Sequence, residues 1–369
     1  MGQRSEDEED KLAKTLIVAV YVPTYNRAER LQATLSSLLE QTWGDFYLTV
    51  VDDCSTDDTA GMVAGFNDPR LRYVCNAERL GMCGNWNRCV ELALEGEAPY
   101  VLIAHDDDWY APKLLEREIE FLEKNRRAGL VYPAFHYYNE AEGRFSSRKP
   151  YSEDRLMTAI EALDELCFKG KYCIATPAVL ARRDAYMRAG SFDASFKICP
   201  DLDLWWRMLE HYDIGYINEH LHIHTVHKSQ VSSSPNAVED TIGQKELKRT
   251  LDRALERIIA RRPDLDAARY QERISHYCAQ RALLGAKDAL LSGQFLITGR
   301  VAQGACGLNR AVDVCLAAAV LQMLNNPVGR FFCLVGVKIW RRVRAKPVPI
   351  LNSDECKRFL CAKGNPAPK

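Results

Sequence analysis

The chain has 369 residues, a length that allows two domains or one large domain with an appendage. Its 49 Lys and Arg residues nearly balance its 50 Asp and Glu residues, and the formal net charge of −1 leaves no basic field for general nucleic-acid binding. The 13 cysteines include no C-x-x-C pair, which disfavours a disulfide framework and a structural zinc site. These properties argue against a small module and a DNA-binding protein, and they favour reduced thiols in the cytoplasm.

The N-terminal part begins with a polar, acidic segment at 1–14, which predicts a flexible tail and not a secretory signal. The run TLIVAVYV at 15–22 is rich in β-branched residues, as in a strand buried on both faces, and Pro23 is expected to end it. Apolar residues then recur at helical spacing over 27–41, and FYLTVVDD at 46–53 predicts a second strand.

The same alternation continues along the chain. RLRYVCN at 70–76 predicts a third strand, a helix is expected around 85–94, and YVLIAH at 100–105 predicts a fourth strand. Strands and helices that alternate at this interval indicate βαβ units. The predicted fold class is therefore α/β with a mostly parallel central sheet.

The pattern becomes less regular after the fourth strand. The segment AGLVYPA at 128–134 is expected to be helical, with irregular sequence after it to about 185, and a packed helix is predicted over 200–210. From 236 onward, charged sequence with periodic apolar residues predicts a helical C-terminal region.

Polar clusters follow three of the predicted strands: PTYNR, DDCSTDD and HDDDW. In open α/β sheets, ligands bind beyond the carboxyl ends of the strands. The carboxylates of Asp106, Asp107 and Asp108 repel one another, so they indicate either a hard divalent cation facing phosphate oxygens or a solvated turn before the next helix. Asp52 and Asp53 add acid at the same edge, where a carboxylate can accept hydrogen bonds from a uracil imide or a ribose hydroxyl.

With these motifs in order, the sequence resembles the family 2 glycosyltransferases, which have the GT-A fold. The likeness is strong over 15–125 and looser over 170–232. The resemblance implies a GT-A (Rossmann-like) sheet and an inverting, metal-dependent transfer of a sugar from a nucleotide-sugar donor to a hydroxyl acceptor, in polysaccharide or glycoconjugate synthesis.

The resemblance assigns the donor side of the site to the first two motifs. Pro23 and Tyr25 match residues that contact the nucleotide base, and Arg27 is placed near the phosphates. Asp53 matches the acid that pairs with the base.

The HDDD segment resembles the metal motif of the family. Asp107 is then the metal ligand, Asp106 lies nearer the ribose and Asp108 is a supporting partner. His105 stands where many members have an acid, so the strict D-x-D form is absent. The expected cofactor is Mn²⁺ or Mg²⁺.

The later segment CPDLDLWWRM resembles the acidic motif of the family, which makes Asp201 the general base. Asp203 is the alternative base, although an acid in the first turn of a helix also favours that helix. His227, in HKSQVS, matches a histidine that approaches the metal or diphosphate in some relatives. His220, His222 and His224 alternate along the chain, which predicts that they lie on one face of an edge strand. Zinc binding by these histidines is the alternative.

These roles suit the chemistry of glycosyl transfer. An acceptor hydroxyl is a poor nucleophile, so a carboxylate must take its proton as the new bond forms. A metal ion neutralises charge on the departing diphosphate while the sugar passes through an oxocarbenium-like state. One displacement inverts the anomeric carbon.

The expected domain organisation has two main parts. Residues 15–235 form the GT-A catalytic domain, with the donor part at 15–125 and the acceptor part at 126–235, and residues 236–369 form the helical C-terminal region. Apolar and basic residues over 311–346 predict contact with an anionic membrane surface, or packing on the core or on a second subunit.

The expected partners are a nucleotide-sugar donor, with a UDP-sugar favoured, and a glycan or lipid-linked acceptor. The expected location is the cytoplasm, with peripheral contact at the inner face of the cell membrane. Two other functions stay open at this point. A sugar nucleotidyltransferase would be expected to carry a glycine-rich phosphate loop after the first strand, which PTYNRAER lacks. A non-catalytic nucleotide-sugar-binding protein would share the same carboxylates.

Overall fold

The computed structural model describes residues 17–171, 174, 176–227, 230, 242–291, 356 and 358–360. The described strands form one ten-stranded sheet in the order β3-β2-β1-β4-β9-β6-β10-β5, with β7 paired to β6 and β8 paired to β10. The strands are β1 (Val18–Thr24), β2 (Phe46–Asp52), β3 (Leu71–Cys75), β4 (Tyr100–Ile103), β5 (Trp109–Tyr110), β6 (Ala128–Asn139), β7 (Arg144–Arg148), β8 (Arg155–Met157), β9 (Leu180–Arg182) and β10 (Asp213–Val226).

The sheet contains two parallel blocks. Strands β3, β2, β1 and β4 run parallel to one another, and β6 runs parallel to β10. Strand β9 joins the blocks and is antiparallel to both β4 and β6. The mostly parallel α/β sheet predicted from the sequence is confirmed.

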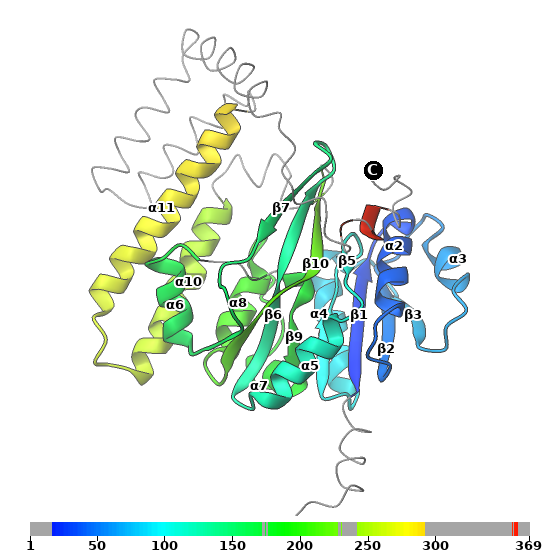
Figure 1. The fold of residues 1–369 in the computed structure, drawn as a ribbon, viewed down its shortest axis with the longest axis horizontal. Coiled ribbons are helices and arrows are strands. Elements are labelled where there is room, and N and C mark those ends of the chain that lie inside the picture. The colour runs from blue at the N-terminus through cyan, green and yellow to red at the C-terminus, as the bar shows by residue number, and fades with distance from the viewer. Residues whose placement is uncertain are drawn as a thin grey trace, which may run out of the picture.

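Helices cover both faces of the sheet. They are α2 (Ala28–Leu39), α3 (Thr59–Ala64), α4 (Gly81–Glu95), α5 (Leu114–Lys124), α6 (Ala159–Cys167), α7 (Arg183–Ala189), α8 (Pro200–Met208), α10 (Ile242–Arg261) and α11 (Ala267–Leu291), together with the 3₁₀ turn η1 (Thr176–Ala178). In Figure 1, α6, α10 and α11 lie beyond β6 and β10 at one end of the molecule, and α2 and α3 lie beside β1 to β3 at the other.

The alternation of side chains along β1 explains the two apolar layers. Val18 and Val20 belong to a cluster shared with α2 and α5, whereas Ala19 and Tyr21 belong to a cluster shared with α4, α8, α10 and α11. All four side chains are almost completely buried. Each fully buried large apolar side chain contributes about 1.5–3 kcal/mol, so the two clusters hold the strand ends in a fixed position.

Pro23 does not end the first strand, contrary to the sequence prediction. Strand β1 continues to Thr24, and Pro23 is in register with Val51 of β2. Successive residues of β1 direct their backbone groups to β2 and β4 in turn. Strand β4 pairs with β1 only as far as Tyr21, so no ladder hydrogen bond is lost when Pro23 has no N–H.

The prediction of a helix at 128–134 is wrong. This segment is the first half of the buried strand β6, which pairs with β9, β10 and β7. A short apolar run does not distinguish a helix from a strand by periodicity, and here the long-range pairing with β10 decides. The expected edge strand around His222 is also wrong, because β10 has β6 on one side and β5 and β8 on the other.

The C-terminal helices pack directly on the sheet domain. Leu251 and Leu255 of α10 and Ile274 of α11 share an apolar cluster with α6 and α8, as the helical periodicity predicted for this region. The Tyr270 hydroxyl also donates to Asp164 of α6 at 2.7 Å. The division of the chain at residue 235 stays a prediction.

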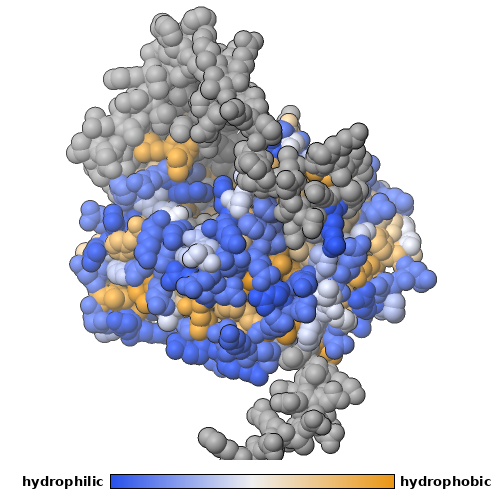
Figure 2. Space-filling view, viewed as in Figure 1, coloured by the Kyte–Doolittle hydropathy of each residue, from blue (hydrophilic) through white to orange (hydrophobic). Residues whose placement is uncertain are grey.

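The visible face of the described body is mostly hydrophilic, with small separate apolar groups (Figure 2). Among the described helices, none combines the length and the apolar character needed to cross a bilayer. The predicted flexible tail at 1–14 and the predicted membrane-contact segment at 311–346 lie outside the described residues.

A buried acid in α5 makes the stability of this fold depend on pH. Glu118 is fully buried, and no Lys, Arg or His side chain of the described residues forms a hydrogen bond with it. Burial raises the pKa of Glu118 well above its ordinary value, and the backbone of Leu180 opposes this only in part. Above the pKa of about 4.3 in the unfolded chain, the unfolded state releases a proton that the folded state keeps.

Glu118→Gln is therefore expected to gain stability over the wild type as pH rises from roughly 5 to 8, by at most about 1.4 kcal/mol per pH unit. Urea unfolding at several pH values measures the difference in unfolding free energy between the two proteins. Glu120→Gln, at an exposed position of the same helix, is the control. It removes only an exposed ion pair with Arg117, a kind of pair that contributes about 0–1 kcal/mol, so its difference should change far less with pH. A pH-independent difference for Glu118→Gln would contradict the prediction.

Candidate active site

A cavity of about 440 Å³ opens at the carboxyl ends of β1, β2 and β4. Nine residues singled out in the sequence line it: Pro23, Tyr25, Arg27, Asp53, His105, Asp106, Asp107, Asp201 and His224. Asp108 and His227 are buried behind Asp107, whereas Asp203 lies outside this cavity. The fold thus brings together residues that are up to 178 positions apart, from Pro23 to Asp201.

The loops after β1 and β2 are tied together by Asn26. Its backbone lies in the left-handed region, with φ of 52°, which Asn adopts more readily than most residues. The Asn26 Oδ1 accepts from the backbone N–H of Thr56 at 2.7 Å, and its own N–H donates to the Ser55 hydroxyl at 2.8 Å. These bonds fix the PTYNR loop against the loop that carries Asp53.

Asp53 is held at the start of α4. One carboxylate oxygen accepts from the backbone N–H of Leu80 at 2.7 Å, and the other accepts from the N–H of Gly81 at 2.8 Å. The Asn76 amide adds a bond at 3.1 Å. A carboxylate near a helix N-terminus satisfies N–H groups that the helix leaves unpaired, so Asp53 is oriented before any ligand arrives.

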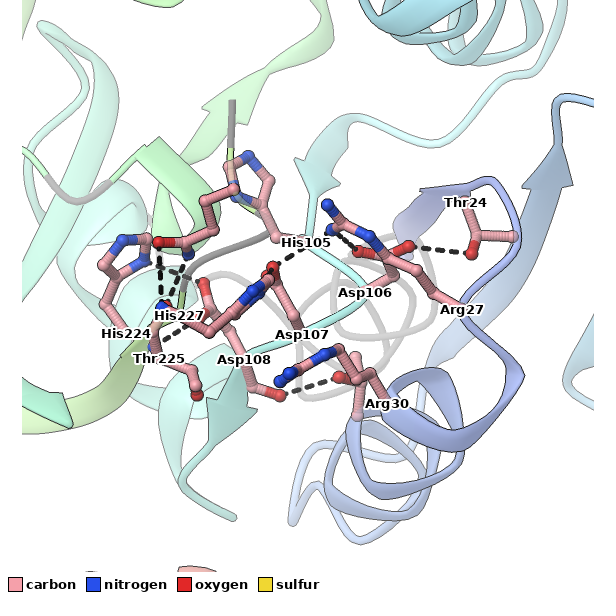
Figure 3. A network of polar contacts seen from close by, with 12 residues as sticks. Thr24, Arg27, Arg30, His105, Asp106, Asp107, Asp108, His224, Thr225 and His227 are labelled. Carbon is pink, nitrogen blue, oxygen red and sulfur yellow. Dashed lines mark hydrogen bonds and ion pairs between the residues drawn. The ribbon is translucent and has the colours of Figure 1, made fainter. Parts of the chain in front are cut away.

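Asp106 forms hydrogen bonds with two residues of the PTYNR motif. Its Oδ2 accepts from the Thr24 hydroxyl and its Oδ1 from Arg27, both at 2.8 Å. Burial raises the pKa of Asp106 to about 6, although the Arg27 guanidinium opposes the shift. In Figure 3, Thr24 and Arg27 lie beside Asp106, at one end of the row of three acids.

Asp107 lies between Arg27 and His227. Its Oδ2 is 2.8 Å from His227 Nε2 and 3.1 Å from an Arg27 nitrogen. Burial opposes ionisation of this carboxyl, but the hydrogen bond with His227 holds its pKa below the ordinary value. The other oxygen, Oδ1, is buried and has no hydrogen-bond partner among the described residues. An ionised carboxylate with one free oxygen fits the expected role of a metal ligand.

Asp108 points away from Arg27 and toward β10. Its Oδ2 is 3.1 Å from His222 Nε2 and 3.1 Å from His224 Nδ1, and its Oδ1 accepts from the Thr225 N–H at 2.7 Å. Burial disfavours the charged form, but His224 and His222 outweigh it and hold the pKa of Asp108 well below its ordinary value. This acid therefore anchors the loop after β4 to β10.

His105, where the resemblance led us to expect an acid, forms part of the cavity wall. Its ring stacks on Trp86, with centroids 5.4 Å apart. Burial lowers the pKa of His105, with Asp108 and Asp107 opposing the shift, so a neutral imidazole is favoured at neutral pH. One nitrogen of His105 and one oxygen each of Asp107 and Asp108 lie within 4.8 Å of one another, an arrangement that could hold a metal ion.

Asp201 lies across the cavity at the start of α8. Its Oδ2 accepts from the Thr176 hydroxyl at 2.6 Å, and its Oδ1 from the Leu202 N–H at 2.8 Å. Burial raises the pKa of Asp201 above its ordinary value, although the bond from Thr176 opposes this. A base whose pKa is raised toward the working pH transfers protons more efficiently than an exposed Asp.

Glu246 of α10 holds the loop that leads to Asp201. Its carboxylate accepts from the backbone N–H groups of Lys197, Ile198 and Cys199 at 2.8, 2.8 and 3.1 Å. The C-terminal helical region therefore supports one wall of the cavity.

Asp203 has a different environment from Asp201. It is 1% exposed and forms an ion pair with Arg207 at 2.8 Å, one helical turn along α8. A second arginine, Arg253 of α10, lies 3.5 Å from the other oxygen. These contacts agree with the structural role that the sequence allowed for this acid.

Four residues of the site were missed by the sequence analysis as contributors: Asn26, Arg79, Thr176 and Glu246. The Arg79 guanidinium lies over the Tyr25 ring at 4.0 Å from its centroid, inside the cavity. Only Asn26 lay within a motif already singled out. The others carry no local signal, because their partners are distant in the chain.

Residues 19–189 match the family model described as glycosyl transferase family 2. This segment is therefore a glycosyl transferase family 2 domain. It is 25% identical over 222 residues to the uncharacterized glycosyltransferase RP339 of Rickettsia prowazekii, covering 59% of this chain and 66% of that protein. It is also 28% identical over 240 residues to a putative colanic acid biosynthesis glycosyl transferase, WcaA, of Escherichia coli K12, covering 59% of this chain and 76% of that protein.

The fold of this chain is similar to that of a solved structure. The crystal structure of S. aureus TarS 1-349 in complex with UDP-GlcNAc superposes with a TM-score of 0.59 at 17% identity, covering 86% of this chain and 92% of that one. This likeness confirms the GT-A fold. The chain spans slightly less than two thirds of the length of the Rickettsia relative.

Asp53→Asn is expected to lower the unfolding free energy by about 1–3 kcal/mol, because an amide nitrogen would replace one acceptor and face a backbone N–H at the start of α4. Urea unfolding measures this change. Asp58→Asn, an exposed acid whose side chain caps no helix, is the matched control and should stay within about 0.5 kcal/mol of the wild type. Equal effects of the two substitutions would show that Asp53 does not hold α4.

Proposed function

We propose that this family 2 enzyme is an inverting, metal-dependent glycosyltransferase that moves a sugar from a nucleotide-sugar donor to a hydroxyl acceptor. The observation that carries the proposal is the meeting of Asp53, Asp107 and Asp201 around one cavity. These three acids come from the ends of two strands and the start of one helix. A base-binding carboxylate, a metal-binding carboxylate and a proton acceptor are the groups that such a transfer requires.

The base of the donor is assigned to the end of the cavity near Asp53. Tyr25, backed by Arg79, offers an aromatic face for stacking, and the Asp53 carboxylate can accept from a uracil imide. A UDP-sugar is therefore the favoured donor. Arg27 would exchange part of its ion pairing with Asp106 and Asp107 for the donor phosphates, because guanidinium groups bind phosphate well.

Asp107 is the residue expected to hold the divalent ion, with His105 and His227 beside it. When bound there, Mn²⁺ or Mg²⁺ would neutralise negative charge on the departing diphosphate. The fit rests on the buried Oδ1 of Asp107, to which no group of the described residues forms a hydrogen bond.

Asp201 is assigned as the general base. Its carboxylate would take the proton of the acceptor hydroxyl as that oxygen attacks the anomeric carbon. With the base on one side of the sugar and the diphosphate on the other, one displacement suffices and the anomeric configuration inverts. Thr176 would keep the carboxylate pointed at the acceptor.

The acceptor side of the cavity is mixed in character. Trp86, Phe135 and Ile198 supply apolar surface, and Lys197 supplies a positive charge. Aromatic faces suit the apolar faces of sugar rings, and the name of the relative WcaA refers to colanic acid synthesis. A glycan or lipid-linked acceptor is therefore proposed, as in polysaccharide or glycoconjugate synthesis.

Asp201→Asn is expected to lower the transfer rate by a factor on the order of 10²–10⁴ while leaving donor affinity nearly unchanged, because the amide cannot accept the hydroxyl proton. Release of the nucleoside diphosphate by the purified protein measures turnover, and calorimetry measures donor binding. Asp203→Asn tests the neighbouring acid and should retain the wild-type rate in folded protein. If wild type and Asp201→Asn both bind donor and neither turns it over, the protein is a nucleotide-sugar-binding protein and the proposal is wrong.

Calorimetry with UDP-, GDP- and dTDP-sugars, with and without Mn²⁺, is expected to show the tightest binding for a UDP-sugar with the metal present. Asp107→Asn should remove most of the metal-dependent gain, because it replaces the expected ligand oxygen. Donor affinity that is equal with and without Mn²⁺ in the wild type would argue against metal dependence. A preference for GDP or dTDP would correct the base assignment.

A further inference from the structure

Two histidines of β10 and the last acid of the HDDD segment form a compact cluster behind the cavity. Asp108 Oδ2, His222 Nε2 and His224 Nδ1 converge on one another, and all three atoms lie within 4.8 Å. The carboxylate oxygen is 3.1 Å from each imidazole nitrogen. We propose that these three residues form a second divalent metal site beside the one expected at Asp107, with Asp108 between the two sites. The inference does not rest on the proposed reaction.

The spacing of the three atoms fits a common metal ion. Bonds of about 2.0–2.2 Å from one ion to nitrogen or oxygen place neighbouring ligand atoms about 3–3.5 Å apart. The measured carboxylate-to-imidazole distances of 3.1 Å fall in this range. The two imidazole nitrogens lie within 4.8 Å of each other, so a closing of the cluster by at most about 1–2 Å would bring all three atoms to one ion.

The chemistry of the ligands selects the class of ion. Two imidazoles and one carboxylate suit the borderline first-row ions such as Zn²⁺, Co²⁺ and Fe²⁺. Mg²⁺ prefers oxygen ligands, so it is a poor occupant of this site. The ion expected at Asp107 thus prefers oxygen ligands, whereas the ion proposed here accepts imidazole nitrogen as well.

The fold builds this cluster and gives it access to the cavity. Asp108 and His222 have fully buried side chains, whereas the side chain of His224 is 21% exposed and lines the cavity. The rings of Tyr110 and Tyr137 pack against His222 and His224, respectively, at 5.2 and 5.3 Å between centroids. The two histidines are thereby oriented, and an ion can enter from the cavity side.

The neighbouring His220 does not belong to the cluster. The register of β10 against β6 shifts between His220 and His222. His220 instead stacks on His136 at 4.1 Å and is 2.7 Å from the Ser147 hydroxyl. A bulge re-aims side chains in this way, and it leaves a matched histidine on the same strand for a control.

The test uses the full chain, treated with a chelator and then titrated with Co²⁺ in the absence of nucleotide. Calorimetry measures affinity and stoichiometry, and visible absorption of bound Co²⁺ reports nitrogen and oxygen coordination. We expect at least one Co²⁺ per chain in the wild type and in His220→Gln, and one Co²⁺ per chain in Asp107→Asn, where the site expected at Asp107 is impaired. The double variant His222→Gln/His224→Gln should bind Co²⁺ roughly tenfold more weakly or worse, because even supporting residues of metal sites contribute this much.

Competition and folding controls complete the experiment. Zn²⁺ should displace Co²⁺, whereas Mg²⁺ at the same concentration should not. The single variant His224→Gln, at the partly exposed position, tests the site if the double variant does not fold, as judged by circular dichroism. Absence of Co²⁺ binding in the wild type, or equal binding after loss of His224, would overturn the proposal and leave Asp108 as a hydrogen-bonded anchor. Loss of the Co²⁺ spectrum in Asp107→Asn would also overturn it, because the ion would then belong to the donor site.

Discussion

The structure depends on the compensation of three adjacent buried carboxylates at the end of β4. Asp106 turns to Arg27 and Thr24, Asp107 to His227 and Arg27, and Asp108 to β10. Buried charge is costly unless it is paired, so the three acids need partners from the PTYNR loop, from β10 and from the residue that follows β10. The same pairing that makes the HDDD segment tolerable therefore joins the PTYNR loop, the loop after β4 and strand β10 into one site.

Strand β10 links the two halves of the molecule at this point. It pairs with β6 along most of its length, and residues near its end form hydrogen bonds with Asp108 in the loop after β4. On the other side of the cavity, Glu246 of α10 holds the backbone before Asp201. The donor and acceptor sides of the proposed reaction are thus positioned by segments that follow both of them in the chain.

Local signals account for the elements that were predicted correctly. The strands around Val20, Val50 and Leu102 are continuous apolar runs between polar clusters, and the first motif lies at the end of β1 as expected. The resemblance to family 2 glycosyltransferases supplied the roles of Asp53, Asp107 and Asp201, and the structure places all three on one cavity. Their roles in catalysis remain predictions.

The sequence by itself determined the α/β class, the parallel block of strands and the position of the polar clusters at strand ends, because periodicity and turn residues act over short range. Only the tertiary structure decided that 128–134 is a strand, because its partner β10 lies 80 residues or more further along the chain. It also decided that His222 and His224 meet Asp108 while His220 does not, since a register shift within β10 separates them. Contacts between residues so far apart leave no local pattern in the sequence. They stabilise the protein only once the strands of the sheet have paired.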